Sequence, residues 1–227
     1  MKKIIVVLLS ALLLSGCLDI TEEVFLEKDG SGRYVTTIDM SKMQEMLEMF
    51  KSFSPDAKEG GNMDLSNLDS MQNMMGDLSG VPGISEVRKE RVDSNIFRVS
   101  FRFRDVRALN DAMRKRNEKQ ATMGDMYSFS PGSFTCNDTT MMGLNKAMQE
   151  MNGEVGASDS MAMAMQMIQG MMGDMTYRTI YHFPGKVSSF SNQEAKLSED
   201  GKTLRLEINL FDKEKSHTLQ NKVAFQK

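Results

Sequence analysis

Apolar and polar residues alternate along several short stretches of the chain, and this period of two predicts β-strands. The stretches are residues 20–26, 34–40, 84–92, 97–103, 177–183 and 204–210, with a weaker one near 219–225. Residues 28–32 (Lys-Asp-Gly-Ser-Gly) and 130–133 (Ser-Pro-Gly-Ser) are turn sequences that predict hairpins. Most neighbouring strands are therefore expected to pair as antiparallel hairpins.

Apolar residues at steps of three and four predict helices between these strands. Helices are expected to begin after Ser41, near Asp64 and after Asp105, and again within residues 140–175. In the third helix we expect apolar residues to face inward and the cations at 114–116 to face solvent.

The order of these elements predicts an α+β fold. We expect an antiparallel β-sheet built from hairpins, with amphipathic, Met-rich helices packed on one face of it. Residues 17–227 are expected to form this one domain. A mobile loop is predicted at about 54–63, where Ser, Pro, Asp and Gly interrupt the pattern, and a Met-rich helical insertion at about 140–175.

The first residues have a different character. Two lysines precede an apolar run over residues 4–14, which is too short to span a bilayer, so residues 1–16 are predicted to be a signal peptide. The run ends in Leu-Ser-Gly-Cys at residues 14–17, which resembles the lipobox of bacterial lipoproteins. The resemblance implies cleavage between Gly16 and Cys17, and a diacylglyceryl group and a further acyl chain such as palmitate on Cys17. Two or three acyl chains anchor a protein durably to a membrane without spanning it. Leu18, rather than an aspartate, follows the cysteine, and by the same resemblance this favours the outer membrane of the cell envelope.

Three turn segments carry a second resemblance. The turn at 28–32, the segment Tyr-His-Phe-Pro-Gly-Lys-Val at 181–187 and the segment at 198–203 are similar to those of the LppM-type lipoproteins. This envelope family has no established activity, so the resemblance implies no catalytic residues.

Charge, cysteine and histidine content exclude several kinds of function. The net charge of −3 gives no support for nucleic-acid binding. With Cys17 lipidated, Cys136 has no disulfide partner in the chain, and it is expected to be a small buried hydrophobe rather than a reactive thiol. His182 and His217 have no catalytic partner at an informative spacing, and no nucleophile elbow or phosphate-binding loop occurs. We therefore expect no catalytic residue, no cofactor and no enzymatic activity.

The chain contains 23 methionines, and three interpretations remain open for those at 140–175. They pack a core; they form a deformable apolar surface for a hydrophobic ligand, a membrane or an envelope protein; or their thioethers bind Cu(I). The candidate surface consists of Met161, Met163, Met165, Met167, Met171 and Met172. The candidate metal ligands are Met163, Met167 and Met171.

A run of cations between residues 88 and 116 is typical of a solvated hairpin and helix. Its alternative interpretation is docking on anionic headgroups or glycolipid phosphates through Arg98, Arg102 and Arg104. Together these features predict a membrane-anchored envelope lipoprotein that acts as a binding or structural module, with Cu(I) binding as the alternative.

Overall fold

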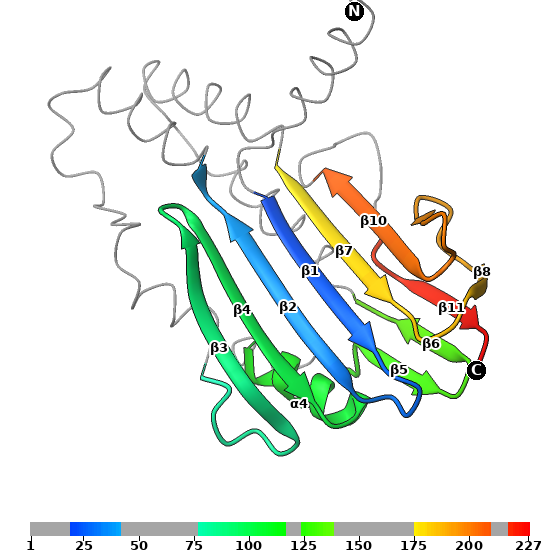
Figure 1. Ribbon diagram of the computed structural model, residues 1–227, viewed down its shortest axis with the longest axis horizontal. Helices are drawn as coiled ribbons and strands as arrows, with labels where there is room; N and C mark the ends of the chain where they lie inside the picture. Colours follow the sequence, from blue (N-terminus) through cyan, green and yellow to red (C-terminus); the bar gives the residue numbers. More distant parts are fainter. Residues whose placement is uncertain (1–18, 42–76, 117–123, 139–174, 210–217) are drawn as a thin grey trace, which may run out of the picture.

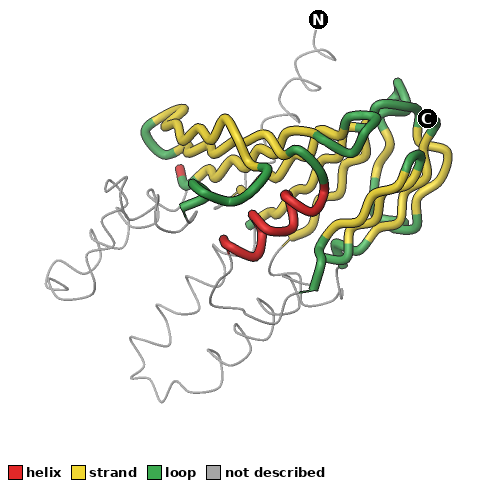
Figure 2. Tube along the Cα trace, turned by 90° about the horizontal axis from the view of Figure 1, so that it is seen from below, coloured by secondary structure: helices red, strands yellow, loops and turns green. Residues whose placement is uncertain are grey.

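The structure is a computed structural model, and it describes residues 19–41, 77–116, 124–138, 175–209 and 218–227. Within these residues the chain forms two β-sheets and one α-helix. The larger sheet stands in front in Figure 1, and the helix and the smaller sheet lie behind it. Figure 2 shows the same arrangement from below, with the helix on one side of the larger sheet. The other face of this sheet is covered by no described helix or strand.

The larger sheet has seven strands in the order β3-β4-β2-β1-β7-β10-β9. Their bounds are β1 Asp19–Leu26, β2 Gly32–Asp39, β3 Ile84–Asp93, β4 Ile96–Phe103, β7 Thr176–His182, β9 Lys196–Leu197 and β10 Thr203–Asn209. The hairpins β1–β2 and β3–β4 join through an antiparallel pairing of β2 with β4. The predicted turn at 28–32 connects β1 and β2, where Gly30 has a φ of 84° that favours glycine.

At the centre of this sheet, β1 and β7 run parallel although more than a hundred residues separate them in sequence. Residues 19–25 pair in register with residues 176–182. This pairing places Glu23 beside Ile180, and Phe25 beside His182. Side chains of both halves of the chain therefore share the two faces of one sheet.

The smaller sheet has four strands in the order β5-β6-β11-β8. Their bounds are β5 Tyr127–Ser130, β6 Ser133–Cys136, β8 Val187–Phe190 and β11 Asn221–Phe225. Phe134 of β6 contacts Tyr181 of β7 and Phe183, which directly follows β7, with ring centroids 5.3 Å and 6.0 Å away. These aromatic contacts hold the two sheets together around a buried core.

The helix α4 covers residues Val106–Arg116. It begins at Asp105, whose carboxylate accepts a hydrogen bond from the Ala108 amide at 2.9 Å, as predicted for a capping residue. Leu109 and Met113 are fully buried against the sheet. The buried side chain of Asn110 donates to the carbonyl of Tyr127 and accepts from its amide, so the helix is also fixed to the smaller sheet.

The predicted fold class was wrong. The described residues form a mostly β structure of two packed sheets with a single helix of 11 residues, in place of one antiparallel sheet carrying several Met-rich helices. The alternation of residues predicts a strand and its buried face, but strands of either sheet alternate in the same way. It also gives no sign that β1 and β7 pair in parallel, because nothing local specifies a partner so distant in sequence.

Several predicted segments lie outside the described residues. They are the signal peptide 1–16 with Cys17, the helices expected after Ser41 and near Asp64, the loop at about 54–63, and all of the Met-rich segment 140–175 except Met175, which is buried. Among the described helices none is long and apolar enough to cross a bilayer.

Candidate functional site

The face of the larger sheet that no described helix or strand covers is here called the outer face. It is organised in rows of side chains that cross the strands. Strand pairing places the residues of each row directly opposite one another. The first row runs across six strands: Ser85, Arg102, Arg33, Phe25, His182 and Thr203. The next row runs Arg88, Ser100, Val35, Glu23, Ile180 and Arg205. Arginines are therefore concentrated at the β3-β4-β2 side of these two rows.

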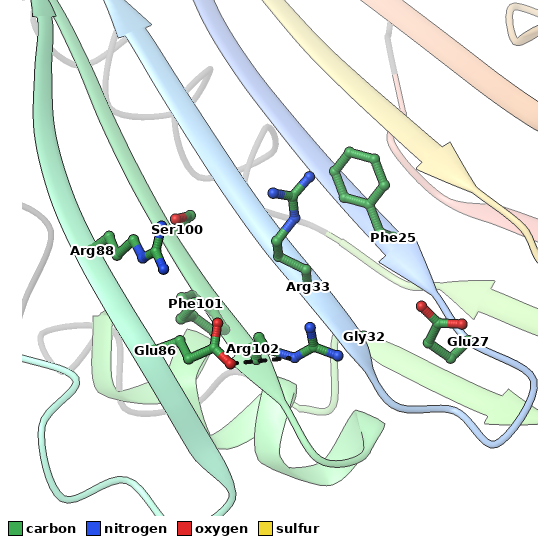
Figure 3. Close-up of a pocket in the computed structure, with 9 residues that line it drawn as sticks. All are labelled: Phe25, Glu27, Gly32, Arg33, Glu86, Arg88, Ser100, Phe101 and Arg102. Carbon is green, nitrogen blue, oxygen red and sulfur yellow. Dashed lines mark ion pairs between the residues drawn. The ribbon is translucent and has the colours of Figure 1, made fainter.

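A groove with a volume of about 330 Å³ opens on the outer face at this place. It is lined by Phe25, Glu27, Gly32, Arg33, Glu86, Arg88, Ser100, Phe101 and Arg102. Figure 3 shows Arg33 and Arg102 between Glu86 on one side and Glu27 on the other, with Arg88 on the same side as Glu86. Three guanidinium groups and two carboxylates thus surround one hollow, which we call the arginine groove.

Arg33 and Arg102 lie directly opposite each other on the antiparallel strands β2 and β4. Like charges in this position repel and destabilise a sheet. Glu86 compensates only weakly, because its carboxylate is 4.0 Å from Arg102 and both side chains are more than half exposed. Arg33 forms no ion pair with any described residue; its guanidinium lies over the ring of Phe25, 4.5 Å from the centroid. The groove therefore holds two positive charges that repel each other, and an anion bound between them would attract both.

Phe25 is enclosed between two nitrogen-rich groups. On the side opposite Arg33, the imidazole of His182 stacks on the Phe25 ring with centroids 4.1 Å apart and planes 3° from parallel. The imidazole is fixed at both nitrogens, since Nε2 lies 3.2 Å from the Glu23 carboxylate and Nδ1 lies 3.2 Å from the Thr203 hydroxyl. The hydrogen bond from His182 lowers the pKa of Glu23, and the nearby arginines act in the same direction. Phe25, the member of this stack that lines the groove, forms its wall on the β1 side.

Glu86 has a backbone conformation that non-glycine residues rarely adopt. Its φ is 51°, the only positive value for a non-glycine residue in the described part of the chain, and it lies where a bulge shifts the β3–β4 register. The left-handed conformation costs an L-residue about 1–2 kcal/mol. Bulges and strained residues of this kind are common beside binding sites, where they redirect a side chain.

This strain has a measurable consequence. We expect Glu86→Gly to be about 1 kcal/mol more stable than Glu86→Ala, because both variants lose the carboxylate but only glycine adopts a positive φ without strain. Urea denaturation of the two variants measures the difference. An alanine variant as stable as the glycine variant would show that residue 86 is not strained in solution.

The predicted cation cluster is divided among several places. Arg98 and Arg102 do share the outer face, and Arg98 lies 3.4 Å from the hydroxyl of Thr37. Arg104 follows the strand and pairs with Asp105 at 3.2 Å. The prediction that Arg116 faces solvent was wrong, because its side chain turns inward to the buried carboxylate of Glu22. The arginines that line the groove include Arg33, which is far in sequence from Arg88 and Arg102. Its position on the outward side of a strand was the only indication in the sequence that it could join them.

The inward course of Arg116 creates a buried polar cluster on the inner face of the sheet. Its guanidinium lies 2.9 Å from the carboxylate of Glu22 and 2.8 Å from the hydroxyl of Tyr34. Only 16% of the Arg116 side chain and 5% of the Glu22 side chain are exposed. Burial opposes the charge of Arg116, but the Tyr34 and Glu22 oxygens keep its pKa well above the usual value. The ion pair is therefore a structural element inside the core.

Cys136 lies in the same interior. It is buried, as predicted, and burial raises the pKa of its thiol to about 12. A thiol with this pKa is protonated at neutral pH and is a poor nucleophile or metal ligand. The described residues contain no group of three or more histidine, cysteine and acidic side chains that would hold a metal ion. The candidate Met surface and the candidate Cu(I) ligands lie outside the described residues, so both remain predictions of the sequence.

Comparisons with known proteins give a structural neighbour and no relative in sequence. No model of a protein family matches the sequence, and no curated protein matches it. Among solved structures, the NMR structure of the folded domain of the Mycobacterium tuberculosis LppM protein is similar, with a TM-score of 0.44 and 11% sequence identity. The similarity covers 94% of this chain and 92% of that one. A similarity at this level shows no family and carries no conclusion on function.

Proposed function

We propose that this chain is a lipid-anchored, non-enzymatic binding protein of the cell envelope, and that its arginine groove binds the phosphate group of a membrane lipid headgroup. The observation that carries the proposal is the opposition of Arg33 and Arg102, with Arg88 lining the same hollow. The guanidinium group of arginine is planar, and two of its N–H groups can donate parallel hydrogen bonds to two oxygens of one phosphate. The hydroxyl of Ser100 at the edge of the groove supplies a further hydrogen-bond donor.

The position of the predicted anchor supports a lipid as the source of the phosphate. The first strand begins at Asp19, two residues after Cys17, so the acyl chains would hold the end of β1 at the membrane. Phe25 follows six residues later in the same strand, about 20 Å further along at 3.3 Å per residue. If the outer face of the sheet lies against the membrane, the groove meets the headgroup layer as a second point of contact, in addition to the anchor at Cys17. The apolar surface proposed for Met161, Met163 and their neighbours is compatible with acyl chains as part of the ligand.

Vesicle binding tests this function. The chain from residue 17 onward, carrying Cys17→Ser so that no acyl chain attaches it, is mixed at low salt with vesicles of phosphatidic acid in a galactolipid background. We expect it to sediment with these vesicles and not with pure galactolipid, because only the former carry phosphate. Equal sedimentation with both kinds of vesicle would contradict phosphate recognition. Labelling the unmodified chain with a palmitate analogue tests the anchor, and Cys17→Ser is expected to remove the label.

A further inference from the structure

We infer that the arginine groove selects a phosphate ligand that also carries an ammonium group, of the phosphoethanolamine type. This inference rests on the proposed function and concerns the identity of the headgroup. Its starting point is the pair of glutamates that share the groove with the three arginines. A site for a simple phosphate would gain from arginines alone, because each carboxylate repels the anion.

The two carboxylates lie on either side of Arg33 and Arg102. Glu86 projects from β3 beside Arg102, and Glu27 lies past the end of β1 on the other side of Arg33 (Figure 3). A phosphate held between Arg33 and Arg102 would therefore have a carboxylate on each side. An ammonium group joined to that phosphate by a two-carbon linker reaches only a few ångströms away, which places it beside one of these carboxylates.

Neither glutamate has a close ion-pair partner among the described residues, so both carboxylates are available to an ammonium group. The Glu86 carboxylate is 4.0 Å from Arg102, at the outer limit of an ion pair. Glu27 is exposed and forms no ion pair with a described residue; only its backbone is fixed, through hydrogen bonds with Ser31 and Gly30. A carboxylate bound to Arg102 at ideal distance would instead compete with the phosphate for the guanidinium.

The backbone at Glu86 gives independent support. A positive φ at residue 86 and the bulge that contains it direct this carboxylate into the groove at a cost in stability. Glycine at this position would remove the strain and the negative charge together. The presence of glutamate is explained if the carboxylate contributes to recognition, and a phosphate without a cation gives it nothing to recognise.

Soluble headgroup analogues test the inference on the mature lipidated chain in detergent. Isothermal titration compares phosphoethanolamine with ethyl phosphate, which keeps the phosphate and the two-carbon chain but lacks the ammonium group. We expect phosphoethanolamine to bind about tenfold more tightly, the gain of a charge-assisted contact in a partly exposed site. The double variant Glu27→Gln/Glu86→Gln is expected to bind ethyl phosphate more tightly than the unmodified chain does and to lose the preference for phosphoethanolamine.

A matched control and two contrary outcomes make the test decisive. Glu90→Gln changes a glutamate of the same strand that does not line the groove, and it is expected to keep the preference. Equal affinity of the unmodified chain for both analogues would overturn the inference and leave phosphate binding intact. Failure of both analogues to bind would overturn the proposed function together with it.

Discussion

Replacing Arg33 and Arg102 by glutamine is expected to lower the affinity for inorganic phosphate at least about tenfold for each substitution, and to remove measurable binding when both are combined. A hydrogen bond to a charged group contributes about 1.5–3 kcal/mol, and 1.4 kcal/mol corresponds to a factor of ten in affinity. Both guanidinium groups line the groove from opposite strands. Isothermal titration at low ionic strength measures the effect.

The same variants are expected to fold about as well as the unmodified chain, because the lost contact of Arg33 with the Phe25 ring offsets the relief of repulsion. Each substitution removes the repulsion between two arginines that lie directly opposite each other, which amounts to a few tenths of a kcal/mol up to about 1 kcal/mol. Arg102→Gln also loses the long contact with Glu86, but an exposed pair of this kind contributes little. Loss of binding without loss of stability would separate a functional role from a structural one.

Arg205 offers a matched control on the same face. It lies in the neighbouring row on β10, pairs with Glu207 and does not line the groove. We expect Arg205→Gln to leave phosphate affinity unchanged. If Arg205→Gln weakened phosphate binding as much as Arg33→Gln does, the attraction would come from the general charge of the face and the groove would have no special role.

Arg116→Met is expected to destabilise the fold by about 3–5 kcal/mol. The variant leaves the Glu22 carboxylate buried without its partner, and removal of one member of a buried ion pair has a cost of this size. The hydroxyl of Tyr34 also loses its hydrogen bond from Arg116. Urea denaturation followed by circular dichroism measures the change in the free energy of unfolding.

Two further variants locate the cause of this loss. Arg114 lies on the same turn of α4 but pairs with Asp111 and Asp125 at the surface, so Arg114→Met is expected to cost less than about 1 kcal/mol. The double variant Glu22→Leu/Arg116→Met replaces both charges with apolar groups and is expected to recover much of the stability. An Arg116→Met variant as stable as Arg114→Met would mean that Arg116 is not buried against Glu22.

Local elements of this fold follow closely from the sequence. Alternation in residues 97–103 correctly predicts that Phe101 and Phe103 are buried while Arg102 faces outward. The turn at 28–32, the capping role of Asp105 and the burial of Cys136 are confirmed in the same way. Each of these depends on neighbouring residues only, and a local pattern carries that information.

The arrangement of the elements and the site depends on pairings that the sequence does not state. The groove requires β2 to lie beside β4, and the stack of Phe25 on His182 requires β1 to lie beside β7. Helical periodicity also failed for Arg116, which continues a basic run at the end of α4 but meets Glu22 from a distant strand. The side chain of Arg116 turns inward because its charge pairs with Glu22, and Glu22 is 94 residues away in sequence.

Direct observation of the arginine side chains tests phosphate binding in the groove most sharply. The Nε–Hε signals of the arginines are followed by NMR while the mature chain in detergent is titrated with inorganic phosphate at constant ionic strength. We expect the signals of Arg33 and Arg102 to shift together and saturate at one midpoint, and those of Arg178 and Arg205 to stay in place. Shifts of equal size at all four arginines, or a linear drift without saturation, would contradict a phosphate site in the arginine groove.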